Sequence, residues 1–317
     1  SYNTYYSSFN ANMAMNEAFL PSSTVRDNVV NIAKLLNYVP RSINASQATV
    51  NLTVQTIQSS GSYPSTVTLK KGAVATGGNY IWNITSDTTV EVNSTTGIAT
   101  FSNLVLKEGS IVTFQYVVNT FATQNYKVPS EDADINTLSV RVKANESSTT
   151  SDLYNLVDTI TGLTASTRVY FLSEGEDMRY EVKFGDDSVG RALKDGEVVM
   201  FEYLVTSGEE ANDVDRFSYT GRMTDTLGQS YSPAAVTLTK VARSQNGTAA
   251  ETIESIKYNA PRFYSSQYRA VTAGDYAILT KKVYPNADAV VAYGGDSLNP
   301  PVYGKVYVAV KTATGAT

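Results

Sequence analysis

The sequence predicts a β-rich α+β protein with several domains, in which β-sandwich-like lobes precede a small C-terminal α/β domain. Three observations predict this fold class. The chain has 317 residues, enough for two or three hydrophobic cores. Its 22 tyrosines stand among many Thr, Val, Ser and Asn residues, a composition typical of strands. Short apolar segments recur about every ten residues along the middle, whereas helical spacing of apolar residues is confined to regions near the two ends.

The N-terminal domain is expected to span residues 1–61. Its first residues are polar and aromatic and favour only a short helix over residues 12–19. An apolar stripe over residues 25–36 predicts an amphipathic helix, with Ser22 or Ser23 as its N-cap.

Two β-rich domains follow: residues 62–130 as a projecting lobe, and residues 131–250 as a central domain. Residues 144–250 of the central domain are expected to pack with the N-terminal domain. Strict alternation of apolar residues over 49–55 predicts the strand that leads into them. The lone Trp82 lies in the middle of a predicted strand, so we expect it in a core rather than in a ligand-binding platform. Glycine-bearing turns separate the other predicted strands, which span residues 67–70, 79–84, 89–92, 98–105, 111–119, 138–143, 168–172, 178–184, 197–205, 217–221 and 235–241.

Three further segments connect these regions. Residues 152–160 fit either a short helix or a break between strands. Residues 245–250 have the composition of a linker, and residues 251–257 form a short helix candidate that leads into the last domain.

The C-terminal α/β domain is expected over residues 251–317, with a ferredoxin-like arrangement. Thr272, followed three residues later by Asp275, predicts a helix that starts with a capping box. Apolar residues at spacings of three and four over 276–283 give this helix one apolar face, with Tyr276 turned to the core. The features expected after it are a stop at Pro285 and Asn286 and strands over residues 289–293 and 305–311.

Composition excludes several kinds of chemistry. The absence of Cys removes disulfides and thiolates, and the absence of His removes a Ser-His-Asp triad and His-ligated zinc. The net charge of -5 argues against nucleic acid as a partner. No apolar run approaches the roughly 20 residues that span a bilayer, so no membrane partner is expected. Phosphate-binding glycine motifs and a nucleophile elbow are also missing, so we expect no cofactor, no metal ion and no catalytic residue.

The densest acidic group leaves alternatives open. It consists of Glu174, Glu176, Asp177, Asp186 and Asp187. If the strand between them is one arm of a hairpin, Glu176 and Asp186 lie at opposite ends, too far apart for one calcium shell. We expect solvated turn residues, with a weak cation site or a glycosidase carboxylate pair as the alternatives.

Three motifs occur in order along the chain. The first reads A-P-R, R-A-V-T and D-Y, at Ala260, Pro261, Arg262, Arg269, Ala270, Val271, Thr272, Asp275 and Tyr276. The second reads F-G-D, a further Gly, then a strand followed by T-x-G and N, at Phe184, Gly185, Asp186, Gly190, Gly208 and Asn212. The third is the passage from helix to strand over residues 25–54. Together they resemble the baseplate J-like family of contractile-tail phages, although Asp187 stands where that family usually has a second Gly, so the turn geometry is expected to differ.

The resemblance implies a non-enzymatic structural subunit of the virion, assembled in the host cytoplasm into the tail baseplate. It implies homodimers that join with other baseplate wedge proteins into a ring, and a conformational change of that ring that triggers sheath contraction. It also implies that the chain is a C-terminal fragment of a longer protein and that residues are missing at both of its ends. Two alternatives from other classes remain: a receptor-binding or adhesive β module of a tail fibre, and a carboxylate glycosidase.

Overall fold

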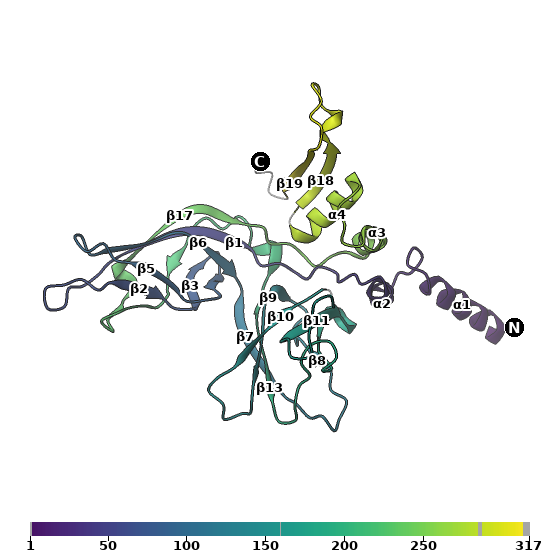
Figure 1. The fold of residues 1–317 in the computed structure, drawn as a ribbon, viewed down its shortest axis with the longest axis horizontal. Coiled ribbons are helices and arrows are strands. Elements are labelled where there is room, and N and C mark those ends of the chain that lie inside the picture. Colours follow the sequence, from purple (N-terminus) through teal and green to yellow (C-terminus); the bar gives the residue numbers. More distant parts are fainter. Residues whose placement is uncertain (1, 159, 285–286, 313–317) are drawn as a thin grey trace.

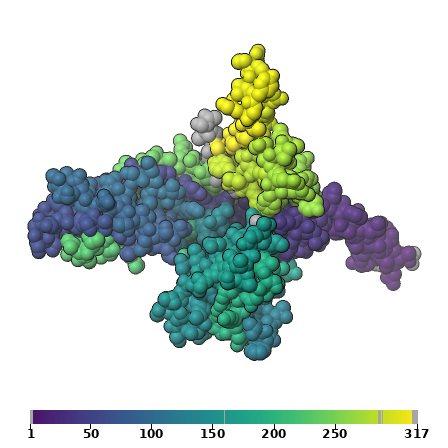
Figure 2. Space-filling model, viewed as in Figure 1, coloured from purple at the N-terminus to yellow at the C-terminus, as the bar shows by residue number. Residues whose placement is uncertain are grey.

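The computed structural model describes residues 2–158, 160–284 and 287–312. Three bodies meet near the middle of the molecule, and one N-terminal helix extends away from them (Figure 1). Two bodies are lobes built on β-sheets, and the third is a smaller unit of helices and a two-stranded sheet. The space-filling view shows the same projections (Figure 2). The prediction of a β-rich α+β fold with a small C-terminal α/β region is confirmed.

Two helices, α1 (Tyr2–Glu17) and α2 (Arg26–Leu35), begin the described chain. α1 is longer than the short helix predicted over residues 12–19. Its side chains from residue 3 to residue 16 are all exposed, so nothing in the described chain covers this helix.

The predicted serine cap of α2 is wrong. Val25 occupies the N-cap position and makes no side-chain hydrogen bond. The carboxylate of Glu17 binds the chain just before this helix, where it accepts hydrogen bonds from the backbone N–H groups of Thr24 (2.9 Å) and Val25 (3.2 Å). A negative charge at a helix N-terminus also interacts favourably with the helix dipole.

The first lobe consists of a six-stranded sheet that packs on a four-stranded sheet. The larger sheet has the order β14 (Ser218–Tyr219), β3 (Gly72–Gly77), β4 (Tyr80–Ile84), β6 (Ile98–Glu108), β1 (Gln47–Gln55) and β17 (Val236–Gln245). The smaller sheet has the order β16 (Ser230–Tyr231), β15 (Met223–Asp225), β2 (Thr66–Leu69) and β5 (Thr88–Glu91). The larger sheet is nearly closed, since Ser244 at the end of β17 exchanges backbone hydrogen bonds with Asp213 and Val214, close to β14.

Side chains of both sheets form the core of this lobe. Every second residue of β1 is buried from Ala48 to Val54, as its alternation predicts. Trp82 is completely buried, donates its indole N–H to the carbonyl of Gly77 (3.1 Å) and packs edge-to-face on Phe217. The prediction that Trp82 belongs to a core is confirmed.

The second lobe is a single curved sheet of seven strands. Its order is β7 (Ser110–Val117), β13 (Val198–Val205), β9 (Ala133–Lys143), β10 (Asp152–Leu156), β11 (Val169–Glu174), β12 (Tyr180–Phe184) and β8 (Tyr126–Lys127). Its two edges approach each other, because the hydroxyl of Tyr116 on β7 donates to the carbonyl of Lys127 on β8 (2.8 Å). The sheet is therefore barrel-like and nearly closed.

The C-terminal unit consists of α3 (Ile253–Ser266), α4 (Ala273–Val283), β18 (Ala287–Gly294) and β19 (Val306–Thr312). Buried side chains of α2 and α3 pack together and attach this unit to the rest of the molecule. The helix predicted over residues 251–257 is much longer than expected. The predicted stop at Pro285 and Asn286 lies outside the described residues.

The predicted apolar face of α4 is only partly correct. Ile278 is the buried residue of this helix, Tyr276 is half-buried, and Val283 is 86% exposed. The spacing of apolar residues identified the helix but not which side of it faces the small sheet.

Two other predictions need correction. Residues 152–160 were expected to form a helix or a break, but Asp152–Leu156 is the strand β10. Four short strands, β3, β8, β15 and β16, were not predicted, because they have two to six residues and too few alternating positions.

Strand pairing crosses the predicted domain boundaries. β1, from predicted domain 1–61, lies between β6 from the predicted projecting lobe and β17 from the predicted central domain. β7, also from the predicted projecting lobe, pairs with β13 of the other sheet. The division into four domains, at residues 1–61, 62–130, 131–250 and 251–317, stays a prediction.

Candidate functional site

The A-P-R motif lies inside helix α3. Thr252 is the N-cap, and its side chain accepts a hydrogen bond from the backbone N–H three residues on (3.3 Å). Ala260 is fully buried against α2, and Pro261 is exposed in the helix interior. The guanidinium of Arg262 lies over the ring of Tyr258, 3.5 Å from its centroid. The motif therefore serves helix packing on its inner side and presents Arg262 on its outer side.

The R-A-V-T and D-Y motif forms the start of α4. Arg269, Ala270 and Val271 are exposed in the turn before the helix. The side chain of Thr272 accepts from the N–H of Asp275 (3.2 Å), and the carboxylate of Asp275 accepts from the N–H of Thr272 (2.8 Å). The hydrogen bond from the N–H of Thr272 to this carboxylate holds the pKa of Asp275 below its usual range. The predicted capping box is confirmed.

The F-G-D motif brings two glycines into contact in the second lobe. A Cβ atom on Gly185 would lie 2.2 Å from the carbonyl carbon of Gly190, which no side chain tolerates. Gly190 also has a φ of +78°, in the left-handed region. Phe184, just before them, packs edge-to-face on Tyr126 and Tyr154. These residues fix a turn beside an aromatic core.

Asp186 and Asp187 complete this turn by binding backbone groups. One oxygen of Asp186 accepts from the N–H groups of Ser188 and Val189 (both 2.9 Å), which holds the pKa of Asp186 below its usual range. Asp187 has a φ of 64°, the conformation that favours glycine, and its carboxylate accepts from the N–H of Ala192 (2.8 Å). The turn was expected to differ where Asp187 replaces a glycine. Asp187 nevertheless has the left-handed backbone conformation that favours glycine.

Gly208 and Asn212 lie where the two β lobes meet. The side-chain oxygen of Asn212 accepts from the N–H of Gly247, and its amide donates to the carbonyl of the same residue (both 2.9 Å). A Cβ atom on Gly247 would lie 2.2 Å from the carbonyl oxygen of Gly208, so these two backbones are in direct contact. The side chain of Asn212 thus forms with Gly247 the two hydrogen bonds that a neighbouring backbone segment would otherwise form.

A buried carboxylate joins the same region. Glu108, at the end of β6, accepts from the hydroxyl of Thr206 (2.5 Å) and from the N–H of Ser207 (3.0 Å), both just after β13. Each contact crosses from one lobe to the other. We call this group the sheet joint; its residues are Glu108, Thr206, Gly208, Asn212 and Gly247.

A second polar group links α2, the second lobe and the C-terminal unit. Arg26 forms a two-point ion pair with Glu174, with Nε–Oε1 and Nη2–Oε2 distances of 2.7 and 3.1 Å. Arg26 also donates to the backbone carbonyl of Glu251. Glu174 is only 2% exposed, so the prediction of a solvated turn residue is wrong at this position, whereas Glu176, Asp177, Asp186 and Asp187 are exposed as predicted.

Glu251 is the centre of this group. Its carboxylate accepts hydrogen bonds from the hydroxyl of Tyr38 (2.9 Å) and the amide of Asn259 (2.8 Å), among others. Nearby, the hydroxyl of Tyr180 donates to the carbonyl of Pro40 (2.9 Å). We call this group the helix joint; its residues are Arg26, Tyr38, Glu174, Tyr180 and Glu251.

Burial controls the ionisation of the helix joint. Burial, and then the charge of Glu251, raise the pKa of Tyr38 far above its ordinary value. Burial likewise raises the pKa of Tyr180. Both hydroxyls therefore remain protonated donors. Burial also raises the pKa of Glu174, and the hydrogen bond and charge of Arg26 offset this only in part.

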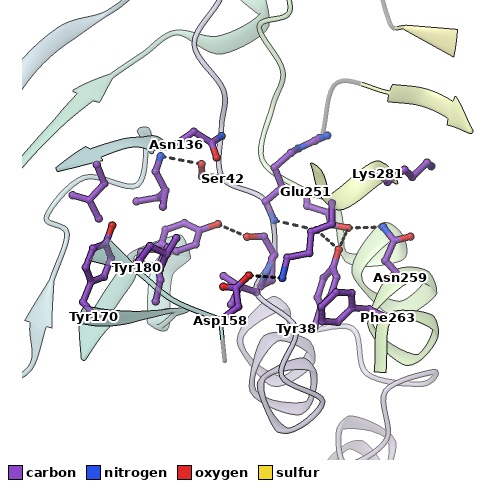
Figure 3. A pocket seen from close by; sticks show the side chains of 18 of the residues that line it. Tyr38, Ser42, Asn136, Asp158, Tyr170, Tyr180, Glu251, Asn259, Phe263 and Lys281 are labelled. Atoms are coloured by element: carbon purple, nitrogen blue, oxygen red, sulfur yellow. Dashed lines mark hydrogen bonds and ion pairs between the residues drawn. The ribbon is translucent and has the colours of Figure 1, made fainter. Parts of the chain in front are cut away.

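A cavity of about 620 Å³ lies beside the helix joint (Figure 3). Its walls come from the second lobe, from residues 38–42, and from α3 and α4. Figure 3 shows Tyr170 and Tyr180 on the side of the second lobe and Asn259 and Phe263 on the side of α3. The ion pair between Lys282 and Asp158 (2.9 Å) bridges the same two bodies.

Among residues 2–158, 160–284 and 287–312, no three acidic side chains are grouped so that they could hold a metal ion. The buried carboxylates are each bound by donors of the chain itself. In the described part of the chain, no helix has both the length and the apolar character to cross a membrane.

The sequence pattern did not reveal the helix joint. Arg26 and Glu174 are 148 residues apart, and Arg26 and Glu251 are 225 apart. No local spacing marks such pairs. The sequence marks Glu174 only by its place, just after an apolar strand segment and just before two other acidic residues.

Comparison with known proteins identifies the class. The family model described as "Baseplate structural protein gp6, C-terminal domain I" matches residues 272–317, which include the capping box and the small sheet. The chain is also 24% identical over 338 residues to "Baseplate wedge protein gp6" of Enterobacteria phage T4. This match covers 99% of the chain and 49% of that protein, so the chain spans about half the length of the curated relative it matches.

Both matches are to structural proteins of the phage tail baseplate. Within that class, the chain is a homologue of baseplate wedge protein gp6. The predictions of a baseplate location and of a protein that is not an enzyme are confirmed by this homology.

Proposed function

We propose that the chain is a structural subunit of the baseplate wedge, whose copies form dimers that build the inner baseplate ring. The ring would relay the conformational change that triggers sheath contraction. The single observation that carries the proposal is the similarity to a baseplate wedge protein over 99% of the chain. Two polar joints between three bodies support a mechanical role, because their hydrogen bonds and ion pair hold the bodies together.

The C-terminal hairpin supports self-association. Val306, Val308 and Val310 share one face of β19, and each is more than one-third exposed. A two-stranded sheet is only marginally stable in water, and an open strand edge invites pairing with another chain. We therefore propose this hairpin as part of the dimer contact.

Helix α1 supports association with other wedge proteins. It is rich in Asn, Ser and Tyr, which are modest helix formers, and its side chains from residue 3 to residue 16 are exposed. Isolated helices of about 12–15 residues are marginal in water. A partner in the baseplate that covers the exposed Tyr5 and Phe9 would supply the missing stability.

The experiment is sedimentation of the full chain and of Val308→Glu. We expect a concentration-dependent dimer that the substitution weakens at least tenfold, since a charge would be buried in the contact. Val241→Glu, at an exposed valine of β17, is the matched control and leaves the dimer unchanged. A chain that stays monomeric, or a dimer indifferent to Val308→Glu, contradicts the proposed contact.

The finer fold predictions belong to the same proposal. α4, β18 and β19 follow one another in the order of the central part of a β-α-β-β-α-β arrangement, which supports the ferredoxin-like prediction. The shared core of the six- and four-stranded sheets supports the sandwich-like prediction for the first lobe.

A further inference from the structure

The C-terminal unit is held differently on its two sides. On one side, α3 packs on α2, and Ile256 and Ala260 are buried against Val29 and Ala33. On the other side, α3 and α4 face the second lobe across the cavity of about 620 Å³. Packed protein interiors contain few gaps larger than a water molecule, so a space of this size separates two bodies that are not packed on each other there.

Lys282, near the end of α4, bridges the two sides of this cavity. Its ammonium group donates to the carboxylate of Asp158, just after β10 (2.9 Å), and to the hydroxyl of Tyr268 (3.1 Å). It also lies over the rings of Phe263 and Tyr268, 4.5 and 4.7 Å from their centroids. Asp158 belongs to the second lobe, whereas both aromatic residues belong to the C-terminal unit. Lys282 would therefore keep its cation–π contacts if it separated from Asp158.

The contact between Lys282 and Asp158 can be broken at a small cost in free energy. The two side chains are 39% and 44% exposed, and exposed ion pairs change an equilibrium by at most about fivefold. Separation would expose little further apolar surface, since Leu153 and Leu156, which line the cavity from β10, are each already 47% exposed. Two positions of the C-terminal unit would thus be close in free energy, and a protein that binds one of them better would change their populations.

We propose that Lys282 is a latch between two positions of the C-terminal unit. In the closed position, which the structure describes, Lys282 binds Asp158. In the open position, the unit has rotated about its contact with α2, the ion pair is broken and the cavity is wider. Relative motion is the normal expectation for two bodies that share a small polar contact. A part for this rotation in the baseplate rests on the proposed function, whereas the latch itself does not.

The test is single-molecule fluorescence energy transfer on the full chain. Because the sequence has no Cys, two introduced cysteines bind the dyes specifically. Val291→Cys on β18 and Phe121→Cys in the second lobe, at residues 60% and 91% exposed, report the position of the C-terminal unit. We expect a major closed population and a minor open one with lower transfer efficiency. The measurement observes single chains at high dilution, so it fails separately from the proposals of a dimer and a ring.

Substitution identifies the latch residue. Lys282→Met should raise the ratio of open to closed chains about fivefold. Lys281→Met is the matched control, since this neighbouring lysine of α4 has no ion pair within the described residues, and it should leave the ratio unchanged. Lys282→Asp should raise the ratio further by repulsion, and Asp158→Lys in the same chain should lower it again. An unchanged ratio in Lys282→Met and Lys282→Asp, or an equal change in Lys281→Met, overturns the proposal.

Salt and a second dye pair complete the test. Raising the salt concentration from 0.1 to 1 M shortens the Debye length from about 10 to about 3 Å, so the ratio of open to closed chains should rise in the wild type and change less in Lys282→Met. Dyes on Ile57→Cys, at a residue of the first lobe that is 59% exposed, and on Phe121→Cys report the two β lobes and should show one population throughout. If this pair changes together with the first, the motion is not that of the C-terminal unit and the latch is refuted.

Discussion

The sheet joint connects the two β lobes, whereas the helix joint connects α2, the second lobe and the C-terminal unit, and the two joints use different contacts. In the sheet joint, backbone touches backbone: Gly208 and Gly247 approach so closely that no side chain fits between them. In the helix joint, the contacts are made chiefly by long side chains such as Arg26, Glu174 and Glu251. The cavity lies beside the helix joint.

This difference separates a rigid connection from an adjustable one. Close backbone contact has one geometry, whereas long side chains can keep an ion pair through small rotations. We therefore expect the two β lobes to move as one body and the C-terminal unit to be the part that changes position. The following predictions test that contrast.

The largest expected effect is loss of Arg26. Arg26→Met leaves Glu174 buried without its cation and should lower the free energy of unfolding by about 3–5 kcal/mol. Urea denaturation measures the change. Arg168→Met, which removes an exposed ion pair with Asp152, is the control and should cost at most about 1 kcal/mol. If Arg26→Met lowers the free energy of unfolding no more than Arg168→Met does, the ion pair of the helix joint contributes little to stability.

The next effect is loss of Asn212 in the sheet joint. Asn212→Ala leaves the N–H and carbonyl of Gly247 without their partners and should cost about 1–3 kcal/mol. Asn145→Ala, at an exposed loop position, should stay within about 0.5 kcal/mol. If the lobes move as one body, the Asn212→Ala variant should also gain a separate unfolding step of one lobe by calorimetry. A single unchanged transition argues against coupling through this residue.

The pH dependence of Glu174 should be smaller but has a defined sign. Burial raises its pKa above the ordinary value of 4.5, so the folded protein holds a proton that the unfolded chain releases. The stability that Glu174 contributes is therefore present below about pH 4.5 and is lost as the pH rises through the folded pKa. The difference in unfolding free energy, wild type minus Glu174→Gln, should fall as the pH rises above 4.5. A difference that rises with pH would mean that Arg26 outweighs burial.

The smallest effect is expected outside both joints. Thr272→Ala removes one half of the capping box of α4 and should cost about 1 kcal/mol. Thr272→Ser keeps the hydroxyl and should restore most of that loss. Because this helix end is exposed, the change should be local and should appear as faster amide exchange at the start of α4. A loss of unfolding free energy as large as that expected for Arg26→Met would contradict a purely local effect of the capping box.

The sequence predictions that were correct depended on local interactions. The capping box of Thr272 and Asp275, the alternation of β1 and the burial of Trp82 each depend on neighbours within a few residues or on the apolar character of one side chain. The predictions that failed needed partners far away. β10 is a strand because β9 and β11 provide its hydrogen bonds, and α3 continues through Pro261 because Ile256 and Ala260 are buried against α2.

By itself, the sequence determined the fold class, the order of most elements, the capped helix and the absence of histidine and cysteine chemistry, because each follows from composition or from local periodicity. The tertiary structure decided the rest. It paired Arg26 with Glu174 across 148 residues, bonded Asn212 to Gly247 and placed β10 between β9 and β11. Such contacts depend on how distant segments meet, and their energies come from burial, which no local pattern encodes.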